Sequence, residues 1–138
     1  MNDRIVVNVP TAPAAVGPYS QAIKSGGFIF CSGQIPLDPK TGEVVGTDAA
    51  AQTEQVIKNI SGLLEATGSG LYQIVKTTVF LKNMEDFNAM NEVYSKYFSF
   101  EPPARSTIEV ARLPKDVLVE IECTAHCAKL ETSPAKPF

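Results

Sequence analysis

The segment Pro102–Cys123, PPARSTIEVARLPKDVLVEIEC, decides how the second half of the chain folds and carries its most conspicuous charged residue. Two runs rich in β-branched residues predict strands over about 105–110 and 117–127. Only the six residues ARLPKD separate the two runs, which predicts a β-hairpin. Arg105 lies at the start of the first of these strands. Because burying an unpaired guanidinium is costly, this side chain requires a partner.

Side-chain alternation indicates where the charges of these two strands lie. Arg105, Thr107 and Glu109 share one face of the first strand, and Glu120 and Glu122 share the polar face of the last strand. If the strands are neighbours, one basic and three acidic side chains can lie together. From the residues alone, solvent-facing ion pairs between strands are favoured over a ligand site, and both interpretations stay open.

Working outward from this segment, the chain predicts further strands and a long helix. Ser20–Lys24 and Phe28–Ser32 predict a hairpin, because Gly26 and Gly27 supply the positive φ that a tight turn needs. The β-branched run from Ile74 predicts another strand. Between them, Asp48 is a candidate N-cap and Gly68 a candidate end for a helix. Its apolar residues recur at helical spacing: Val56, Ile60, Leu63 and Leu64.

A second helix is predicted over about Met84–Phe98, with one amide in its apolar stripe. The stripe consists of Phe87, Met90, Tyr94, Tyr97 and Phe98. Asn91, four residues after Phe87, interrupts it and needs hydrogen-bond partners in the core, in an interface or in a ligand. Together the elements predict an α+β domain, with about six strands and two long helices on one sheet face. We expect the other face to be apolar and buried by self-association.

Composition limits the classes of protein that the chain can represent. Its 138 residues, 44% hydrophobic and 20% charged, predict one domain over 1–128 followed by a loose tail over 129–138. There is no apolar run of the roughly 18 to 20 residues that a membrane helix needs. The first ten residues, MNDRIVVNVP, do not have the pattern of a signal or transit peptide. The expected location is therefore the cytoplasm.

Charge and cysteine spacing argue against nucleic-acid and metal sites. Twelve Lys and Arg against fifteen Asp and Glu give a net charge of −3, without a basic cluster that could neutralise several phosphates. Cys31, Cys123 and Cys127 lack the CxxC spacing of zinc or redox sites, and we interpret them as buried thiols. His126 is the only histidine of the chain, which excludes a histidine-cluster metal site.

Four stretches together resemble one protein family. They are GPYSQAI from Gly17, FCSGQIP from Phe30, DFNAMNEVYSKYF from Asp86, and the segment from Pro102 quoted above. Their residues and their order along the chain are similar to those of the Rid family of reactive intermediate deaminases, also called the YjgF or L-PSP family. The resemblance extends from about Ile5 to Ala128, and P-A-R-S followed by L-P-K-D and E-I-E is its most specific part.

The resemblance implies a chorismate-mutase-like α+β subunit with a six-stranded mixed sheet. It also implies a homotrimer, with the sheets forming a central barrel and three clefts between neighbouring subunits. The implied reaction is hydrolysis of 2-imino acids, such as 2-iminobutyrate and the imine form of 2-aminoacrylate, to 2-keto acids and ammonia. Such hydrolysis removes damaging products of pyridoxal-phosphate dehydratases. No metal or organic cofactor is implied.

The resemblance also assigns roles to residues. Arg105 would hold the substrate carboxylate in a two-pronged contact, and Glu120 would transfer protons. The residues implied to bind substrate are Tyr19, Ser32, Gly33, Phe87, Asn91, Arg105 and Thr107. Several bacterial relatives carry cysteine where this chain has Thr107, and threonine cannot undergo thiol oxidation. We interpret Glu109 and Glu122 as structural.

Two alternatives to the deaminase remain open. One is a trimer that binds small carboxylic acids for regulation without converting them. The other is an L-PSP-type endoribonuclease or translation inhibitor. The acidic net charge and the lack of a histidine pair argue against ribonuclease activity.

Overall fold

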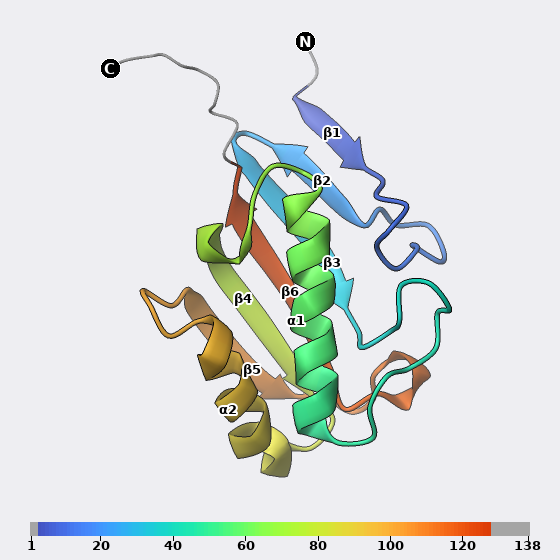
Figure 1. The fold of residues 1–138 in the computed structure, drawn as a ribbon, viewed down its shortest axis with the longest axis vertical. Helices are drawn as coiled ribbons and strands as arrows, with labels where there is room; N and C mark the ends of the chain where they lie inside the picture. The colour runs from blue at the N-terminus through green and yellow to red at the C-terminus, as the bar shows by residue number, and fades with distance from the viewer. Residues whose placement is uncertain (1–2, 128–138) are drawn as a thin grey trace.

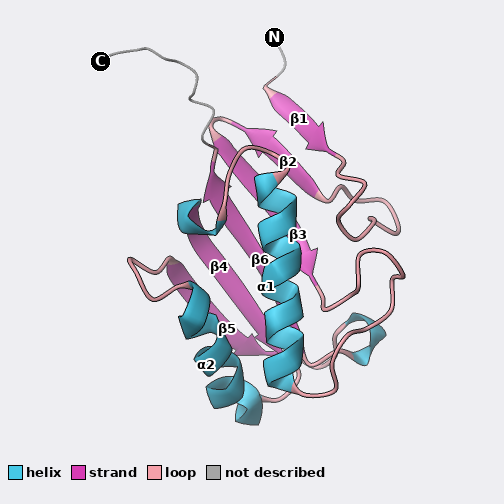
Figure 2. Cartoon of the chain, viewed as in Figure 1, coloured by secondary structure: helices cyan, strands magenta, loops and turns pink. Residues whose placement is uncertain are grey.

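The fold is a single six-stranded sheet with two helices packed on one of its faces (Figures 1 and 2). The structure, a computed structural model, describes residues 3–127, so the tail predicted over 129–138 lies outside the described residues. Within residues 3–127, no helix is both long enough and apolar enough to cross a membrane. The sheet order is β1-β2-β3-β6-β4-β5. The elements are β1 Arg4–Val7, β2 Ala22–Ser25, β3 Phe28–Gln34, α1 Ala49–Glu65, β4 Ile74–Leu81, α2 Phe87–Tyr97, β5 Ala104–Glu109 and β6 Val119–His126.

The predicted first hairpin and first helix are confirmed. β2 and β3 pair antiparallel, and Gly26 and Gly27 turn the chain with φ of 60° and 85°. Asp48 caps α1, because its Oδ1 accepts a hydrogen bond from the backbone N–H of Ala51 at 2.8 Å. The apolar residues of α1 that the spacing predicted are buried against the sheet: Val56, Ile60, Leu63 and Leu64. Ile57 is buried with them. β1 is the strand that the patterns above do not locate.

The second predicted helix is confirmed, with an extra turn at its start. A 3-10 turn, Met84–Asp86, leads into α2, and Met90 and Tyr94 are buried. The carboxylate of Glu109 accepts a hydrogen bond from the backbone N–H of Met84 at 2.7 Å. Glu109 therefore fixes the start of this helical segment against the end of β5, in agreement with a structural role.

The predicted hairpin between the last two strands is wrong. β4 lies between β5 and β6, pairing parallel with β5 and antiparallel with β6. The prediction rested on the length of the loop between β5 and β6. Six residues can close a hairpin, but they can also cross the end of a strand that lies between the two. That passage is fixed by a hydrogen bond of 3.0 Å from the N–H of Lys82 to the carbonyl of Leu118. β4 is a central strand that pairs on both edges, and its inner residues are buried under the helices: Thr77, Val79 and Leu81.

This topology also separates the charges that the sequence placed together. Thr77 of β4 lies opposite both Arg105 of β5 and Cys123 of β6, and its hydroxyl bonds to Tyr94 of α2. Arg105 therefore lies on the sheet face that the helices cover. Glu120 lies opposite Phe80, which is three residues after Thr77 on β4 and therefore faces the other side of the sheet. Glu120 thus lies on the open face. The interpretation as ion pairs between neighbouring strands is wrong.

The open sheet face is less apolar than expected. Val6, Phe30 and Ile108 are large apolar residues that are 57%, 47% and 43% exposed there. Glu120 and Glu122 lie on the same face of β6, between these residues in the strand order. Any partner that covers this face therefore meets carboxyl groups as well as apolar side chains.

Candidate functional site

Arg105 is held at the side of α2 by an amide and two aromatic rings. Its Nη1 donates a hydrogen bond of 2.6 Å to Oδ1 of Asn91. The guanidinium carbon lies 5.5 Å from the ring centre of Phe87 and 4.7 Å from that of Tyr94. Both contacts are within the range of cation–π attraction. Asn91, which interrupts the apolar stripe, therefore finds its partner in Arg105.

Tyr94 is a member of this cluster that the sequence patterns assigned only to the helix core. Its hydroxyl shares a hydrogen bond of 2.7 Å with that of Thr77, which fixes the ring beneath the guanidinium. Burial raises the pKa of Tyr94 above its ordinary value, so the hydroxyl stays protonated. Its spacing of three residues from Asn91 is the sequence signal that pointed to the same helix face.

Thr107 follows Arg105 on the same face of β5. Its Oγ1 is buried, and within residues 3–127 it has no hydrogen-bond partner. Buried hydroxyl groups are rarely left unsatisfied, because desolvation without a hydrogen bond costs about 1–3 kcal/mol. A polar ligand bound on this face of β5 could satisfy that hydroxyl.

Glu120 lies on the other face of the sheet, against Gly33 of β3. A Cβ atom built on Gly33 would lie only 1.9 Å from Oε2 of Glu120. The carboxylate therefore occupies the space that a side chain at residue 33 would fill. The register between β3 and β6 shifts between Cys31 and Gln34, so Ser32 and Gly33 form an irregularity that adjusts the backbone beside Glu120.

The environment of Glu120 favours its neutral form. Burial raises the pKa of this carboxyl above its ordinary value, and the nearby charge of Glu122 raises it further. A carboxyl group with a raised pKa can both take up and release a proton closer to neutral pH. Glu122, which we interpreted as structural, therefore acts on the electrostatics of the candidate acid or base.

Ser32 directly precedes Gly33, and Tyr19 lines a pocket together with Gly33. The two hydroxyl groups differ in the hydrogen bonds that they can still make. The Ser32 hydroxyl donates to the carbonyl of Ser20 at 2.6 Å, and its backbone N–H donates to the carbonyl of Gln21 at 3.0 Å. Ser32 can therefore act on a ligand only as an acceptor through Oγ. The Tyr19 hydroxyl accepts the N–H of Val16 at 3.3 Å, which leaves its own proton available for donation.

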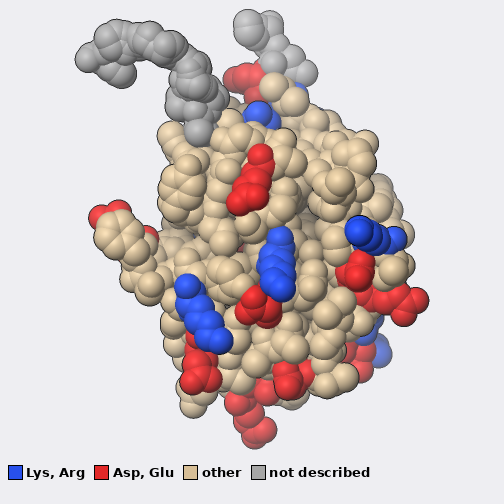
Figure 3. Space-filling model, in the orientation of Figure 1, with Lys and Arg blue, Asp and Glu red and all other residues tan. Residues whose placement is uncertain are grey.

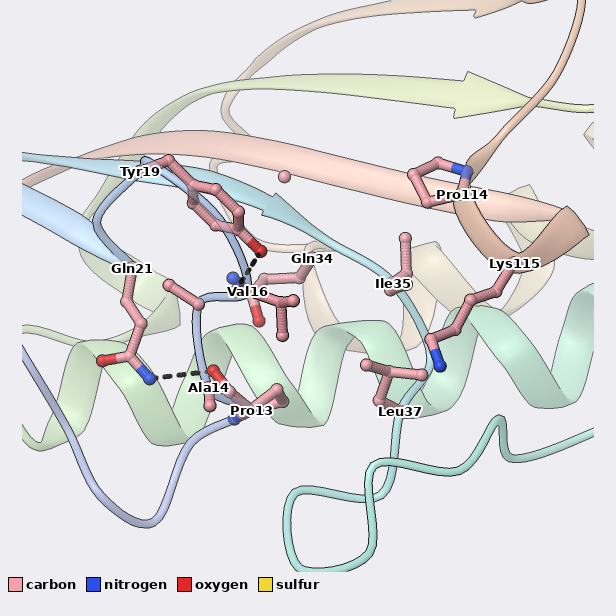
Figure 4. Close-up of a pocket in the computed structure, with 12 residues that line it drawn as sticks. Pro13, Ala14, Val16, Tyr19, Gln21, Gln34, Ile35, Leu37, Pro114 and Lys115 are labelled. Atoms are coloured by element: carbon pink, nitrogen blue, oxygen red, sulfur yellow. Dashed lines mark hydrogen bonds between the residues drawn. The ribbon is translucent and has the colours of Figure 1, made fainter.

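A pocket of about 280 Å³ opens beside Tyr19 and Gly33 (Figure 4). It was not predicted from the sequence, because its walls come from loops without a distinctive residue pattern. The lining residues are Pro13, Ala14, Ala15, Val16, Tyr19, Gln21, Gly33, Gln34, Ile35, Leu37, Pro114 and Lys115. Except for Lys115, this lining carries no charge.

The predicted site residues thus form two groups within one chain. We call Phe87, Asn91, Arg105 and Thr107 the arginine half-site, and Tyr19, Ser32, Gly33 and Glu120 the glutamate half-site. Strand register places Arg105 on the covered sheet face and Glu120 on the open face. A single chain therefore does not bring the two half-sites together. Residues 3–127 contain no group of three His, Cys, Asp or Glu side chains arranged to hold a metal ion.

Comparison with known proteins identifies the family. Residues 9–127 match the family described as Endoribonuclease L-PSP. A RutC family protein of Pyrococcus horikoshii is 56% identical over 121 residues, which cover 88% of this chain and 96% of the relative. The chloroplastic Reactive Intermediate Deaminase A of Arabidopsis thaliana is 49% identical over 120 residues, covering 87% of this chain and 64% of that protein.

A solved structure supports the same assignment. The crystal structure of the YjgF gene product of E. coli superposes with a TM-score of 0.81 at 49% sequence identity. The similarity covers 88% of this chain and 97% of that chain. The sequence motifs, the six-stranded mixed sheet with two helices on one face, and these relatives agree: the chain belongs to the Endoribonuclease L-PSP family, also known as the Rid or YjgF family.

Proposed function

We propose that this chain is a 2-imino acid deaminase. It would add water to the C=N bond of 2-iminobutyrate or 2-iminopropanoate, the imine form of 2-aminoacrylate. The resulting carbinolamine would then lose ammonia to give the 2-keto acid. One water is consumed and one ammonia is released, and no oxidant or reductant is needed. The Arabidopsis relative named Reactive Intermediate Deaminase A supports this reaction class.

The observation that carries the proposal is an arginine whose hydrogen-bonding fork is still largely free. Within residues 3–127, the hydrogen bond from Arg105 goes to the neutral amide of Asn91, and no carboxylate lies within ion-pair distance. A guanidinium has five N–H donors and can hold a carboxylate through two parallel bonds. Every 2-imino acid carries such a carboxylate next to its reacting carbon.

Glu120 is suited to the proton transfers of this hydrolysis. In its ionised form it would take a proton from the attacking water. In its protonated form it would then deliver that proton to the departing ammonia. A raised pKa favours both steps near neutral pH. The free proton of the Tyr19 hydroxyl would orient the substrate or the water in the same half-site.

Completing the site requires a second copy of the chain. We propose a homotrimer in which the open sheet faces form the inside of a barrel. At each of its three clefts, the arginine half-site of one subunit would meet the glutamate half-site of a neighbour. The position of the two half-sites on opposite sheet faces supports a shared site over one within a single chain.

We also propose a cytoplasmic location. Cys31 of β3 lies directly opposite Cys123 of β6, and both are buried free thiols, as is Cys127. Adjacent thiols persist most readily in a reducing compartment.

The direct test is release of 2-keto acid from 2-iminobutyrate that a threonine dehydratase generates in the assay. Wild type should exceed the spontaneous rate, and Arg105→Ala should lower kcat/KM by at least about 100-fold, because it removes two charge-assisted bonds to the carboxylate. Arg112→Ala, which removes an exposed arginine outside both half-sites, is the matched control and should retain activity.

Two outcomes would contradict the proposal. If the folded wild type does not exceed the no-protein rate, the chain does not hydrolyse this imine. If Arg105→Ala and Arg112→Ala are equally active, Arg105 does not hold the substrate. Carboxylate binding by calorimetry in a protein without turnover would support the regulatory binding trimer instead.

Ribonuclease activity, which the family description names, has less support in the residues. The chain has a net charge of −3, and acidic and basic side chains are interspersed on the helix-bearing face (Figure 3). RNA backbone binding depends on clustered positive charge. If the purified protein cleaves RNA and Arg105→Ala abolishes that cleavage, ribonuclease activity would be favoured over deaminase activity.

A further inference from the structure

The pocket shares two residues, Tyr19 and Gly33, with the glutamate half-site. Gly33 lines the pocket and also packs against the carboxylate of Glu120. Glu120 itself does not line the pocket, so a ligand whose reacting carbon lies at Glu120 would reach the pocket by passing Gly33. Its volume of about 280 Å³ is near the lower end for small-molecule sites, about 300–1,000 Å³. This size suits the side chain of an amino-acid-derived substrate.

The wall of this pocket is fixed by a buried glutamine. Gln21 accepts the N–H of Val9 at 2.6 Å through Oε1. Through Nε2 it donates to the carbonyls of Val9 at 3.1 Å and Pro13 at 2.8 Å. The glutamine therefore holds the loop that forms one wall, and its polar atoms are used in doing so. Much of the remaining surface is apolar, including Val16, Ile35 and Leu37, and suits an aliphatic chain.

Lys115 is the charged residue of this pocket, and its charge is not neutralised within residues 3–127. The salt bridge in its turn joins the neighbouring Asp116 to Lys82 at 2.8 Å, so this carboxylate is already paired. The ammonium group of Lys115 has no hydrogen bond or ion pair among the described residues. Figure 4 shows Lys115 and Tyr19 extending toward the pocket from opposite ends.

The backbone that presents Lys115 is strained. Lys115 and Asp116 both have φ of 55°, a region that residues with side chains rarely adopt. Such strain persists only where surrounding contacts maintain it, and it is concentrated at functional sites. Here the Lys82–Asp116 pair anchors the turn. The result is an apolar pocket with an unpaired cation at one end.

We propose that this pocket takes the side chain of the imino acid, and that Lys115 selects substrates whose side chain ends in a second carboxylate. This inference rests on the proposed deaminase function. The substrate class is therefore 2-imino dicarboxylic acids, of which 2-iminoglutarate is the probe. In the proposed trimer, its inner carboxylate would bind Arg105 of the neighbouring subunit. Its aliphatic carbons would contact the pocket wall, and its distal carboxylate would bind Lys115. The products are 2-oxoglutarate and ammonia.

The test compares kcat/KM for 2-iminoglutarate and 2-iminobutyrate. Amino-acid oxidases with catalase would generate each imine, and semicarbazide would trap the imine that the protein leaves. Lys115→Met should lower the ratio of the two values, iminoglutarate over iminobutyrate, by about fivefold, as expected for one ion pair of an exposed lysine. Lys115→Arg, which keeps the charge, should retain the ratio. Lys58→Met removes an exposed lysine of α1 and is the matched control for net charge.

The outcomes separate this inference from the deaminase itself. A fall of the ratio in Lys115→Met, but not in Lys115→Arg or Lys58→Met, supports selection by Lys115. If the protein hydrolyses both imines and the ratio is the same in all variants, the role of Lys115 is overturned while the deaminase function stands. If wild type hydrolyses neither imine, the proposed function fails and this inference fails with it.

Discussion

At the scale of single residues, the arrangement of the glutamate half-site depends on the missing side chain of Gly33. The carboxylate of Glu120 lies where a Cβ atom at residue 33 would be, at 1.9 Å from its ideal position. The irregular register of β3 at this point brings its backbone against β6. The lack of a side chain at residue 33 therefore leaves room for the Glu120 carboxylate, whereas the family resemblance implied only that Gly33 binds substrate.

Gly33→Ala should lower activity much more than stability. The added methyl group meets the end of a flexible side chain, so Glu120 can rotate away while the sheet stays intact. We expect kcat to fall by about 10- to 100-fold, because a proton-transfer group is misplaced. Imine hydrolysis and thermal unfolding would be measured together.

Gly62→Ala is the matched control for this substitution. Gly62 is in α1, and a Cβ atom there has nothing within 4 Å. Alanine should raise stability by about 0.5–1 kcal/mol and leave activity unchanged. Full activity in Gly33→Ala would show that the position of Glu120 against Gly33 is unimportant for catalysis.

Glu122→Gln should shift the pH dependence of activity. The charge of Glu122 helps to raise the pKa of Glu120. Removing that charge lowers the pKa of Glu120, so its ionised form persists to lower pH. If the ionised form is the base, the acidic limb of the kcat/KM profile should move to lower pH, and Glu65→Gln on α1 should not move it. An acidic limb that stays in place in Glu122→Gln would exclude Glu120 as the group that titrates.

At the scale of elements, α1 fixes loops that carry the site as well as covering the sheet. Gln52 accepts the N–H of Leu118 at 2.7 Å and donates to the carbonyl of Gly46 at 3.1 Å. Asn59 donates to the carbonyls of Ile35 at 3.2 Å and Leu37 at 2.9 Å. The first contact holds the chain two residues before Glu120, and the second holds a wall of the pocket. Polar residues on the buried side of α1 thus connect helix packing to site geometry.

Gln52→Leu should destabilise the protein and disturb this connection. It leaves the N–H of Leu118 without its acceptor, which costs about 1–3 kcal/mol for a buried donor. Urea unfolding at fixed protein concentration would measure the loss, since the stability of the proposed trimer would depend on concentration. Lys58→Ala on the exposed side of the same helix is the control. If Gln52→Leu lowers the free energy of unfolding by less than about 0.5 kcal/mol, the N–H of Leu118 has found another hydrogen-bond acceptor.

At the scale of the whole molecule, local patterns predicted elements well and their arrangement only in part. Asp48 marked the start of α1, and Gly26 and Gly27 marked the first turn, because capping and positive φ are local requirements. The position of β4 between β5 and β6 depends on pairing between distant segments, which loop length does not determine. β1 is short and mostly exposed, so its apolar pattern is weak.

The same limit applied to the candidate site. The sequence and its family resemblance named the members of both half-sites, and Asn91 was identified as an amide in need of a partner. The contact between Asn91 and Arg105 agrees with that need. The separation of Arg105 and Glu120 onto opposite sheet faces was missed, because it depends on which strands are neighbours. The pocket with Lys115 was missed for a different reason, because loops without a distinctive residue pattern form its walls.

In the proposed trimer, each active site combines Arg105 of one subunit with Glu120 of another. The most direct measurement is complementation between Arg105→Ala and Glu120→Gln chains, co-expressed with different tags and purified over both. Each variant alone should be inactive. Every mixed trimer contains one cleft with both native residues, so the mixture should regain about one third of the wild-type rate. Folded mixed trimers without activity, from chains that are each inactive alone, would contradict a site shared between subunits.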